Sequence, residues 1–134
     1  PVKGYSITVN LDETSAEAAP WTSLLDDQTK IVSSRLGKDR FRIAGTAELN
    51  GYNTNIVQER IRPLKKWVRD LFPEVSLEDV NPWAGLRPMT PNMMPIVKRS
   101  DRHWGVWYNT GHGHLGWTLS AFTAKQIAEQ IRKS

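Results

Sequence analysis

Residues able to do chemistry crowd into one short stretch near the C-terminus, "NTGHGHLGWT", residues 109–118. Gly111, Gly113 and Gly116 can adopt positive φ and let the backbone approach a ligand without an intervening Cβ. The helical pattern that follows would present unpaired N–H groups and a partial positive charge at its first turn. Such a site suits an anion or an electron-rich oxygen. A tight strand-to-helix turn, with glycines needed for geometry alone, explains the same residues equally well.

The histidines of this stretch, His112 and His114, raise the question of a metal. Two histidines at i and i+2 can hold zinc or iron only with further ligands, and no cysteine or paired carboxylate lies nearby in the sequence. We therefore expect no metal site, and we assign the histidines to local hydrogen bonds or to a pocket lining. A Rossmann phosphate loop is also excluded, because the strand and acidic residue that should follow it are absent.

Arg87, in "PWAGLRPMTP", is the second candidate. A guanidinium in an apolar segment is costly unless it meets a carboxylate or phosphate in bidentate geometry. A structural ion pair is the commoner role for such an arginine, and a ligand clamp is the alternative. Together with an anion site at a helix start, Arg87 suggests a pocket.

The elements that must position these residues follow from hydrophobic periodicity. Alternation of apolar and polar residues predicts a strand over 4–11 and a hairpin over 30–49. Short apolar runs between turn formers predict three further strands, over 82–89, 94–99 and 104–110. With two helices, this order predicts an α+β fold, in which a largely antiparallel β-sheet is flanked by helices.

Two segments have helical spacing instead. Residues 54–71 are predicted to form a helix capped by Asn53 or Thr54, with a kink or restart at Pro63, and residues 117–133 an amphipathic helix. We interpret the basic residues of the first helix as a solvated surface: Arg60, Arg62, Lys65, Lys66 and Arg69. Four tryptophans late in the chain are expected in the core, with one or two lining a cavity: Trp83, Trp104, Trp107 and Trp117.

Composition bounds the rest. A chain of 134 residues is the size of one compact unit, and the absence of cysteine excludes disulfides and thiolate chemistry. A formal charge of +4 leaves nucleic acid, anionic lipid and acidic small molecules open. Without a long apolar run the chain is expected to be soluble and cytoplasmic. Because it opens inside a strand without methionine, we expect a piece of something longer.

Four segments then join these features: "KGYSITV", "RIAGTAELNGYNT", "WAGLRPMTP" and "NTGHGHLGWTLS". In this order and at these spacings they resemble the C-terminal part of bacterial D-amino acid dehydrogenases, flavoproteins of the D-amino acid oxidase and glycine oxidase superfamily. The resemblance covers nearly all of residues 1–134. It implies a substrate-domain portion plus a C-terminal flavin-contacting loop and helix, that is, the C-terminal portion of a two-domain flavoprotein without its Rossmann FAD-binding half.

The resemblance implies a particular oxidation reaction, with its cofactor and partners. The family binds FAD noncovalently and oxidises a D-amino acid to an imino acid, which hydrolyses to a 2-oxo acid and ammonia. Electrons pass to a membrane-linked respiratory acceptor, which implies peripheral association with the inner face of the bacterial inner membrane. The partners implied are the D-amino acid, this acceptor and the missing N-terminal Rossmann domain or chain, with no nucleic acid. The chain alone is expected to be inactive and to bind FAD weakly or not at all.

The same resemblance assigns the site residues. Arg87 corresponds to the arginine that binds the substrate carboxylate, and Tyr52 in "NGYN" lies near the substrate. The flavin-contacting residues are Gly111, His112, Gly113, Leu115, Gly116, Trp117 and Thr118. Their backbone N–H groups and the helix start would face the pyrimidine edge of the isoalloxazine, where reduced flavin carries negative charge.

One segment departs from the family. Where the family commonly continues "TPDG", this chain has "TPNM", with Asn92 and Met93, and Lys98 stands in the region of a later glycine. The Asp-Gly turn of the substrate-side loop is therefore lost, whereas Arg87 before it is kept. The competing hypothesis is a noncatalytic basic binding module, whose binding to oligonucleotides would fall steeply with salt.

Overall fold

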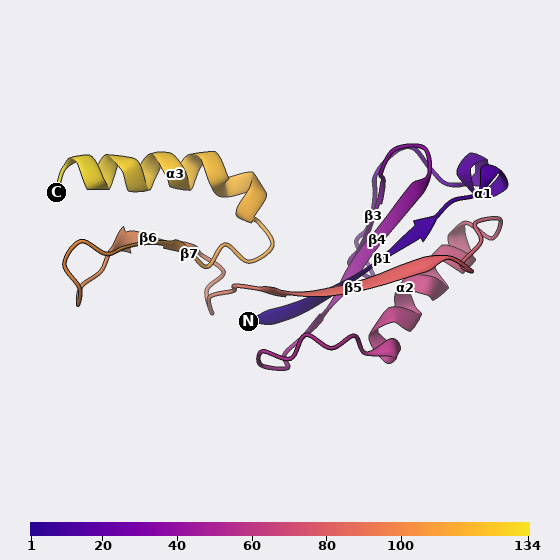
Figure 1. Ribbon diagram of the computed structural model, residues 1–134, viewed down its shortest axis with the longest axis horizontal. Coiled ribbons are helices and arrows are strands. Elements are labelled where there is room, and N and C mark those ends of the chain that lie inside the picture. The colour runs from indigo at the N-terminus through magenta and orange to yellow at the C-terminus, as the bar shows by residue number, and fades with distance from the viewer. The chain divides into compact units, whose positions relative to one another are not determined.

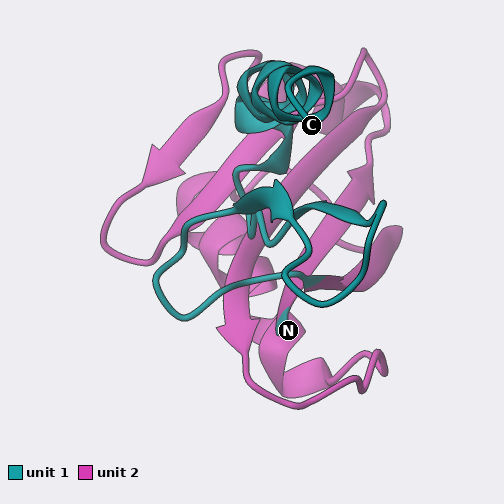
Figure 2. Ribbon diagram, turned by 90° about the vertical axis from the view of Figure 1, so that its left-hand side faces the viewer, with its two compact units in different colours: residues 1–2, 87–134 teal, residues 3–86 magenta.

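The structure, a computed structural model describing residues 1–134, divides into two compact units (Figure 2). The larger unit is Lys3–Leu86, and the smaller unit is Pro1–Val2 with Arg87–Ser134. The sequence predicted a single compact unit. The prediction and the structure differ because the buried hydrophobic residues all lie between Tyr5 and Val75. Only the larger unit therefore has a hydrophobic core.

The larger unit is built on a five-stranded sheet with the order β2-β3-β4-β1-β5 (Figure 1). Neighbours β1 and β4, β2 and β3, and β3 and β4 pair antiparallel, with Ile7 opposite Ile43 between β1 and β4. The strands are β1 (Val2–Asn10), β2 (Leu24–Asp26), β3 (Ile31–Arg35), β4 (Arg40–Glu48) and β5 (Val80–Arg87). The predicted first strand, hairpin and strand over 82–89 are confirmed, and β2 is an element that periodicity did not reveal.

Helix α2 (Gln58–Leu71) supplies the other half of the core. Its buried residues recur at three- and four-residue spacing and pack with the apolar residues of the strands: Ile61, Leu64, Trp67 and Val68. Pro63 lies inside the helix without ending it. A short helix that was not predicted, α1 (Glu13–Ala18), is capped by Asp12, whose carboxylate accepts the Ser15 N–H at 2.7 Å.

The predicted start of α2 is wrong. The helix is not capped by Asn53 or Thr54 but begins at Gln58, after Val57, which is extended and makes no side-chain cap bond. The Asn53 side chain instead accepts the Asn55 N–H at 2.8 Å, so it organises the preceding loop.

The smaller unit contains a two-stranded hairpin and a helix (Figure 1). Strands β6 (Ile96–Arg99) and β7 (Trp107–Thr110) pair antiparallel, and α3 (Gly116–Arg132) packs along them, with Gln130 Nε2 donating to the Val97 carbonyl at 3.1 Å. Both predicted strands and the final helix are confirmed, and both strands are shorter than predicted. None of the helices in the chain has the length and apolar character needed to cross a membrane.

The predicted burial of the late tryptophans is wrong. Trp104 and Trp117 are 89% and 95% exposed, Trp83 of the larger unit is also exposed, and Trp107 is half-buried. For the three tryptophans of the smaller unit, the physical reason is that a hairpin and one helix offer no second apolar layer. Thr123 and Ser100 are the only buried side chains of that unit. Its large apolar side chains therefore remain on the surface.

Candidate functional site

Arg87 is the last residue of β5 and the first residue of the second part of the smaller unit, where it is half-buried. The residues directly after it pair with the glycine-rich stretch. Met89 forms an isolated antiparallel bridge with His112, and the Gly113 N–H donates to the Pro88 carbonyl at 3.0 Å. The structure thus places the segment that follows Arg87 beside the glycine-rich stretch within one unit.

The backbone of this stretch requires glycine at two positions. Gly111 has φ +78° and Gly113 has φ +57°, both in the left-handed region. A Cβ on Gly111 would lie 2.8 Å from Thr90 Cγ2, and one on Gly113 would lie 3.2 Å from Met89 Cγ. Turn geometry and close packing therefore account for both glycines, and their contact with a flavin remains a prediction.

The start of α3 has the properties expected of a site for negative charge. Leu115 occupies the cap position without a side-chain hydrogen bond, and the first turn contains no acidic residue. Its N–H groups therefore lack a side-chain acceptor and carry the positive end of the helix dipole. Trp117 and Thr118 are exposed beside them, and Gly116 opens the helix.

His112 makes the local hydrogen bond that the sequence suggested. Its Nε2 lies 3.1 Å from Thr123 Oγ1, a buried hydroxyl that also donates to the Leu119 carbonyl. His112 is thereby attached to α3, whereas His114 is exposed. No group of three or more histidine and carboxylate side chains in the chain could hold a metal ion.

The chain forms a turn after Pro91 although it lacks the family's Asp-Gly pair. Asn92 Oδ1 accepts from the Met94 N–H at 3.1 Å, and Thr90 Oγ1 donates to the Met94 carbonyl at 2.8 Å. Met93 has φ +60°, so it adopts the left-handed conformation in which glycine is the least strained residue. Residues 90–94 therefore form a tight turn without the glycine that is common in the family.

Tyr52 belongs to the larger unit, whereas Arg87 and the glycine-rich stretch belong to the smaller unit. It lies on the loop between β4 and α2, and its side chain is 84% exposed.

Sequence reasoning overlooked the buried Lys3. Lys3 lies two and four residues before Tyr5 and Ile7 in β1, so it occupies the same core-facing side of the strand. This alternation with Tyr5 and Ile7 was the sequence signal that could have revealed the burial of Lys3.

Two glycines of the smaller unit provide a matched pair of substitutions. Gly111 and Gly105 both have positive φ, but a Cβ on Gly105 would meet nothing within 4 Å. Gly105→Ala should cost about 1 kcal/mol for φ alone, and Gly111→Ala about 1–3 kcal/mol more. The added cost arises because Thr90 is β-branched and hydrogen-bonded, so it cannot easily move. In the 134-residue chain, hydrogen exchange at the Gly113 amide should accelerate in Gly111→Ala much more than in Gly105→Ala, and equal effects would contradict this account.

Comparison with known proteins decides the family. Residues 1–130 match the family model described as "DAO: FAD dependent oxidoreductase". The chain belongs to this family. The expected resemblance is thereby confirmed, and FAD is the cofactor of the family as a whole.

Relatives of this DAO-family chain include two named dehydrogenases. D-amino acid dehydrogenase 3 of Mesorhizobium japonicum is 64% identical over 132 residues, which are 98% of this chain and 32% of the relative. D-amino acid dehydrogenase of Dechloromonas aromatica is 47% identical over 132 residues, 98% of this chain and 31% of the relative. The chain thus spans about a third of the length of the relatives it matches.

Solved structures of similar fold agree. Glycine oxidase from Geobacillus kaustophilus has a TM-score of 0.84 at 21% identity, covering all of this chain and 35% of that one. Iminodiacetate oxidase from Chelativorans sp. BNC1 has a TM-score of 0.83 at 20% identity, covering all of this chain and 36% of that one. At this identity the likeness shows the fold, and it confirms the predicted α+β class.

Proposed function

We propose that this chain is the substrate-side portion, with the flavin-contacting end, of an FAD-dependent D-amino acid dehydrogenase. The reaction oxidises a D-amino acid to an imino acid, which hydrolyses to a 2-oxo acid and ammonia. The two dehydrogenases at 64% and 47% identity support this activity. The structural observation that carries the proposal is the pairing of Pro88 and Met89 with Gly113 and His112, which sets the segment after Arg87 beside the glycine-rich stretch.

Each site residue has a defined role in this proposal. Arg87 binds the substrate carboxylate, because its planar fork matches two carboxylate oxygens. Tyr52 contributes to the substrate side. The backbone of residues 111–118 contacts the flavin, and the uncapped first turn of α3 offers N–H groups to the electron-rich edge. FAD, when bound, would supply the hydride acceptor, and these N–H groups would stabilise the negative charge of the reduced ring.

The chain fits one end of FAD better than the other. The uncapped helix start and the glycine backbone suit the flavin ring, but the chain contains no strand, phosphate loop, helix and strand in the order that holds a pyrophosphate. Those contacts belong to an N-terminal Rossmann domain or chain in this proposal. Exposed apolar side chains on α3, Trp117, Phe122 and Ile131, offer it a surface to cover.

The electron acceptor in this proposal is a membrane-linked respiratory carrier. In this proposal the enzyme works at the cytoplasmic face of the inner membrane, as a peripherally associated protein. The alternative, a basic module that binds nucleic acid, is less well supported. Two of the α2 cations are engaged on their own helix, since Arg62 pairs with Glu59 at 3.4 Å and Lys66 with Asp70 at 2.5 Å.

The test is a chimera in which this chain replaces the matched 132 residues of the Mesorhizobium relative. We expect the chimera to bind FAD and to reduce an artificial electron-accepting dye with D-alanine or another D-amino acid, but not with the L-enantiomer. The unaltered relative is the control. A folded chimera that carries FAD yet turns over no D-amino acid, while the control does, would refute the proposed function.

A further inference from the structure

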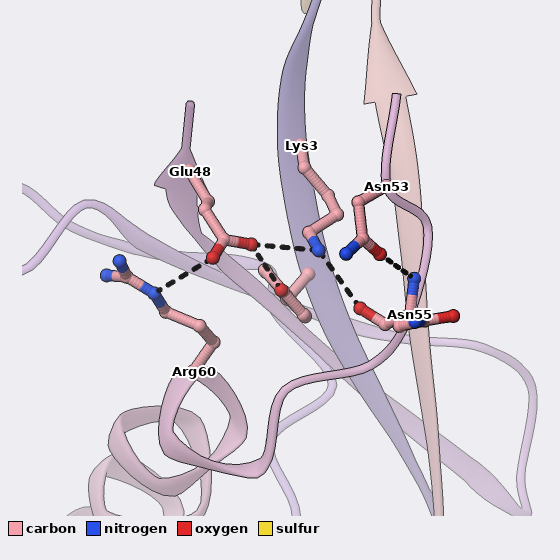
Figure 3. Close-up of polar contacts among 6 residues, drawn as sticks. Lys3, Glu48, Asn53, Asn55 and Arg60 are labelled. Carbon is pink, nitrogen blue, oxygen red and sulfur yellow. Dashed lines mark hydrogen bonds and ion pairs between the residues drawn. The ribbon is translucent and has the colours of Figure 1, made fainter. Parts of the chain in front are cut away.

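Lys3 is a charged side chain with no exposed surface. A buried ammonium is costly unless it is paired and hydrogen-bonded. Lys3 Nζ lies 2.9 Å from Glu48 Oε2 and donates to the Asn55 carbonyl at 3.0 Å (Figure 3). Both interactions lie within the larger unit.

The two partners of Lys3 stand at opposite ends of one loop, residues 49–57, which connects β4 to α2. Glu48 is the last residue of β4, and Asn55 lies shortly before Gln58, where α2 begins. A single ammonium on β1 therefore holds the base of loop 49–57 from both sides (Figure 3). Loops closed at their base by buried contacts open less readily than loops tied only at the surface.

Glu48 is itself held from several directions. The Tyr5 hydroxyl donates to Glu48 Oε2 at 2.5 Å, and Arg60 Nε lies 3.9 Å from Glu48 Oε1. The Tyr5 bond, followed by the bond to Lys3, keeps the pKa of Glu48 below its ordinary value. Hydrogen bonding with Tyr5, and then with Glu48, raises the pKa of Lys3 although burial opposes it. Both groups are therefore charged at neutral pH.

Loop 49–57 presents apolar groups beyond its anchored base. Leu49 and Tyr52 are both 84% exposed. The tip is shaped by local bonds alone, since the Asn53 N–H donates to the Asn50 carbonyl at 3.2 Å, and Gly51 has φ +53°. The orientation of Tyr52 therefore depends on how firmly the base of the loop is held.

We propose that Lys3 is a positioning residue, whose ammonium joins Glu48 to the Asn55 carbonyl and thereby fixes loop 49–57 so that Tyr52 is presented to the substrate. The substrate part of this statement rests on the proposed function. The anchoring of the loop does not, because every contact that carries it lies within the larger unit. The two parts are therefore tested by separate measurements.

The anchoring is tested in the 134-residue chain by hydrogen exchange. Lys3→Met removes the ammonium, and Lys3→Met/Glu48→Gln also removes the carboxylate that would be left buried without its cation. In the double variant, the Asn53 and Asn55 amide hydrogens should exchange about tenfold faster than in the unaltered chain. Amides of the β1–β4 ladder should change little. Lys66→Met, which removes an exposed pair on α2, is the matched control and should leave the loop unchanged. Unchanged exchange in loop 49–57 of the double variant would overturn the proposal.

The substrate role is tested in the chimera. The double variant should raise KM for the D-amino acid about tenfold with kcat within about twofold. Tyr52→Ala should raise KM similarly in the parent, and add little in the double variant, because both changes remove the same interaction. A loosened loop with unchanged KM would overturn the presentation of Tyr52. A chimera without any activity would refute the proposed function and this role with it, whereas the exchange measurement would still decide the anchoring.

Discussion

Arg87→Ala in the chimera is expected to lower kcat/KM for the preferred D-amino acid by about 150-fold, which corresponds to roughly 3 kcal/mol of transition-state binding. Arg87 is half-buried at the end of β5, where water screens its charge less than on an open surface. Loss of the guanidinium would remove the bidentate partner that we propose for the substrate carboxylate. Steady-state kinetics with dye as the acceptor measure the effect directly.

Two further variants define what Arg87 does. Arg87→Lys should also lose most of the activity, because an ammonium cannot reproduce the planar fork. Arg102→Ala, which removes an exposed arginine of the same unit, should leave kcat/KM within about threefold. Arg87 also interacts within the chain, so the thermal stability of each variant must be measured beside its kinetics. Near-normal kcat/KM in Arg87→Ala would show that Arg87 has a structural role alone.

The parts of the fold that could be predicted are those in which periodicity reports burial. In β1 the alternating Tyr5, Ile7 and Val9 are all buried, and in α2 the residues at helical spacing form the buried face. Elements of six and three residues, α1 and β2, carry too little pattern to be recognised in a polar segment.

Exposure of the tryptophans could not be predicted for a different reason. A tryptophan is buried only where a second apolar layer meets it, and residue type alone does not reveal whether that layer exists. Trp67 packs on the sheet of the larger unit, whereas Trp117 lies in a unit without a core. The apolar surface that the late tryptophans leave uncovered is a property of the arrangement of elements.

Sequence reasoning could nominate candidate site residues, but it could not predict how the fold arranges them. Sequence reasoning paired Arg87 with the glycine-rich stretch because both suit negative charge. The bridge between Met89 and His112, and the packing of Thr90 against Gly111, require tertiary structure to be seen. These contacts show that Gly111 is constrained by its neighbour, so its substitution would disturb the site whether or not a flavin lies beside it.

The isolated 134-residue chain is expected to bind FAD with a dissociation constant weaker than about 100 μM, and to show no dehydrogenase activity. The residues proposed to contact the flavin lie in a unit that has no hydrophobic core. The contacts that hold the pyrophosphate and ribose in a dinucleotide site have no counterpart among its elements. A surface that reaches only one end of a ligand gains only part of the interaction energy while still opposing the entropy lost on binding. Titration of the chain into FAD, followed by flavin fluorescence, measures the affinity.

Riboflavin provides the matched control for this prediction, because it keeps the isoalloxazine and lacks the pyrophosphate and adenosine. If the chain contacts only the flavin ring, FAD and riboflavin should bind equally weakly, within about twofold. Adding the remainder of the Mesorhizobium relative, expressed separately, should restore dye reduction with a D-amino acid and produce a strong preference for FAD over riboflavin. Binding of FAD by the chain alone at micromolar or lower concentration, with riboflavin much weaker, would mean that this chain holds the pyrophosphate itself. The division of the cofactor site between this chain and a Rossmann domain would then be wrong.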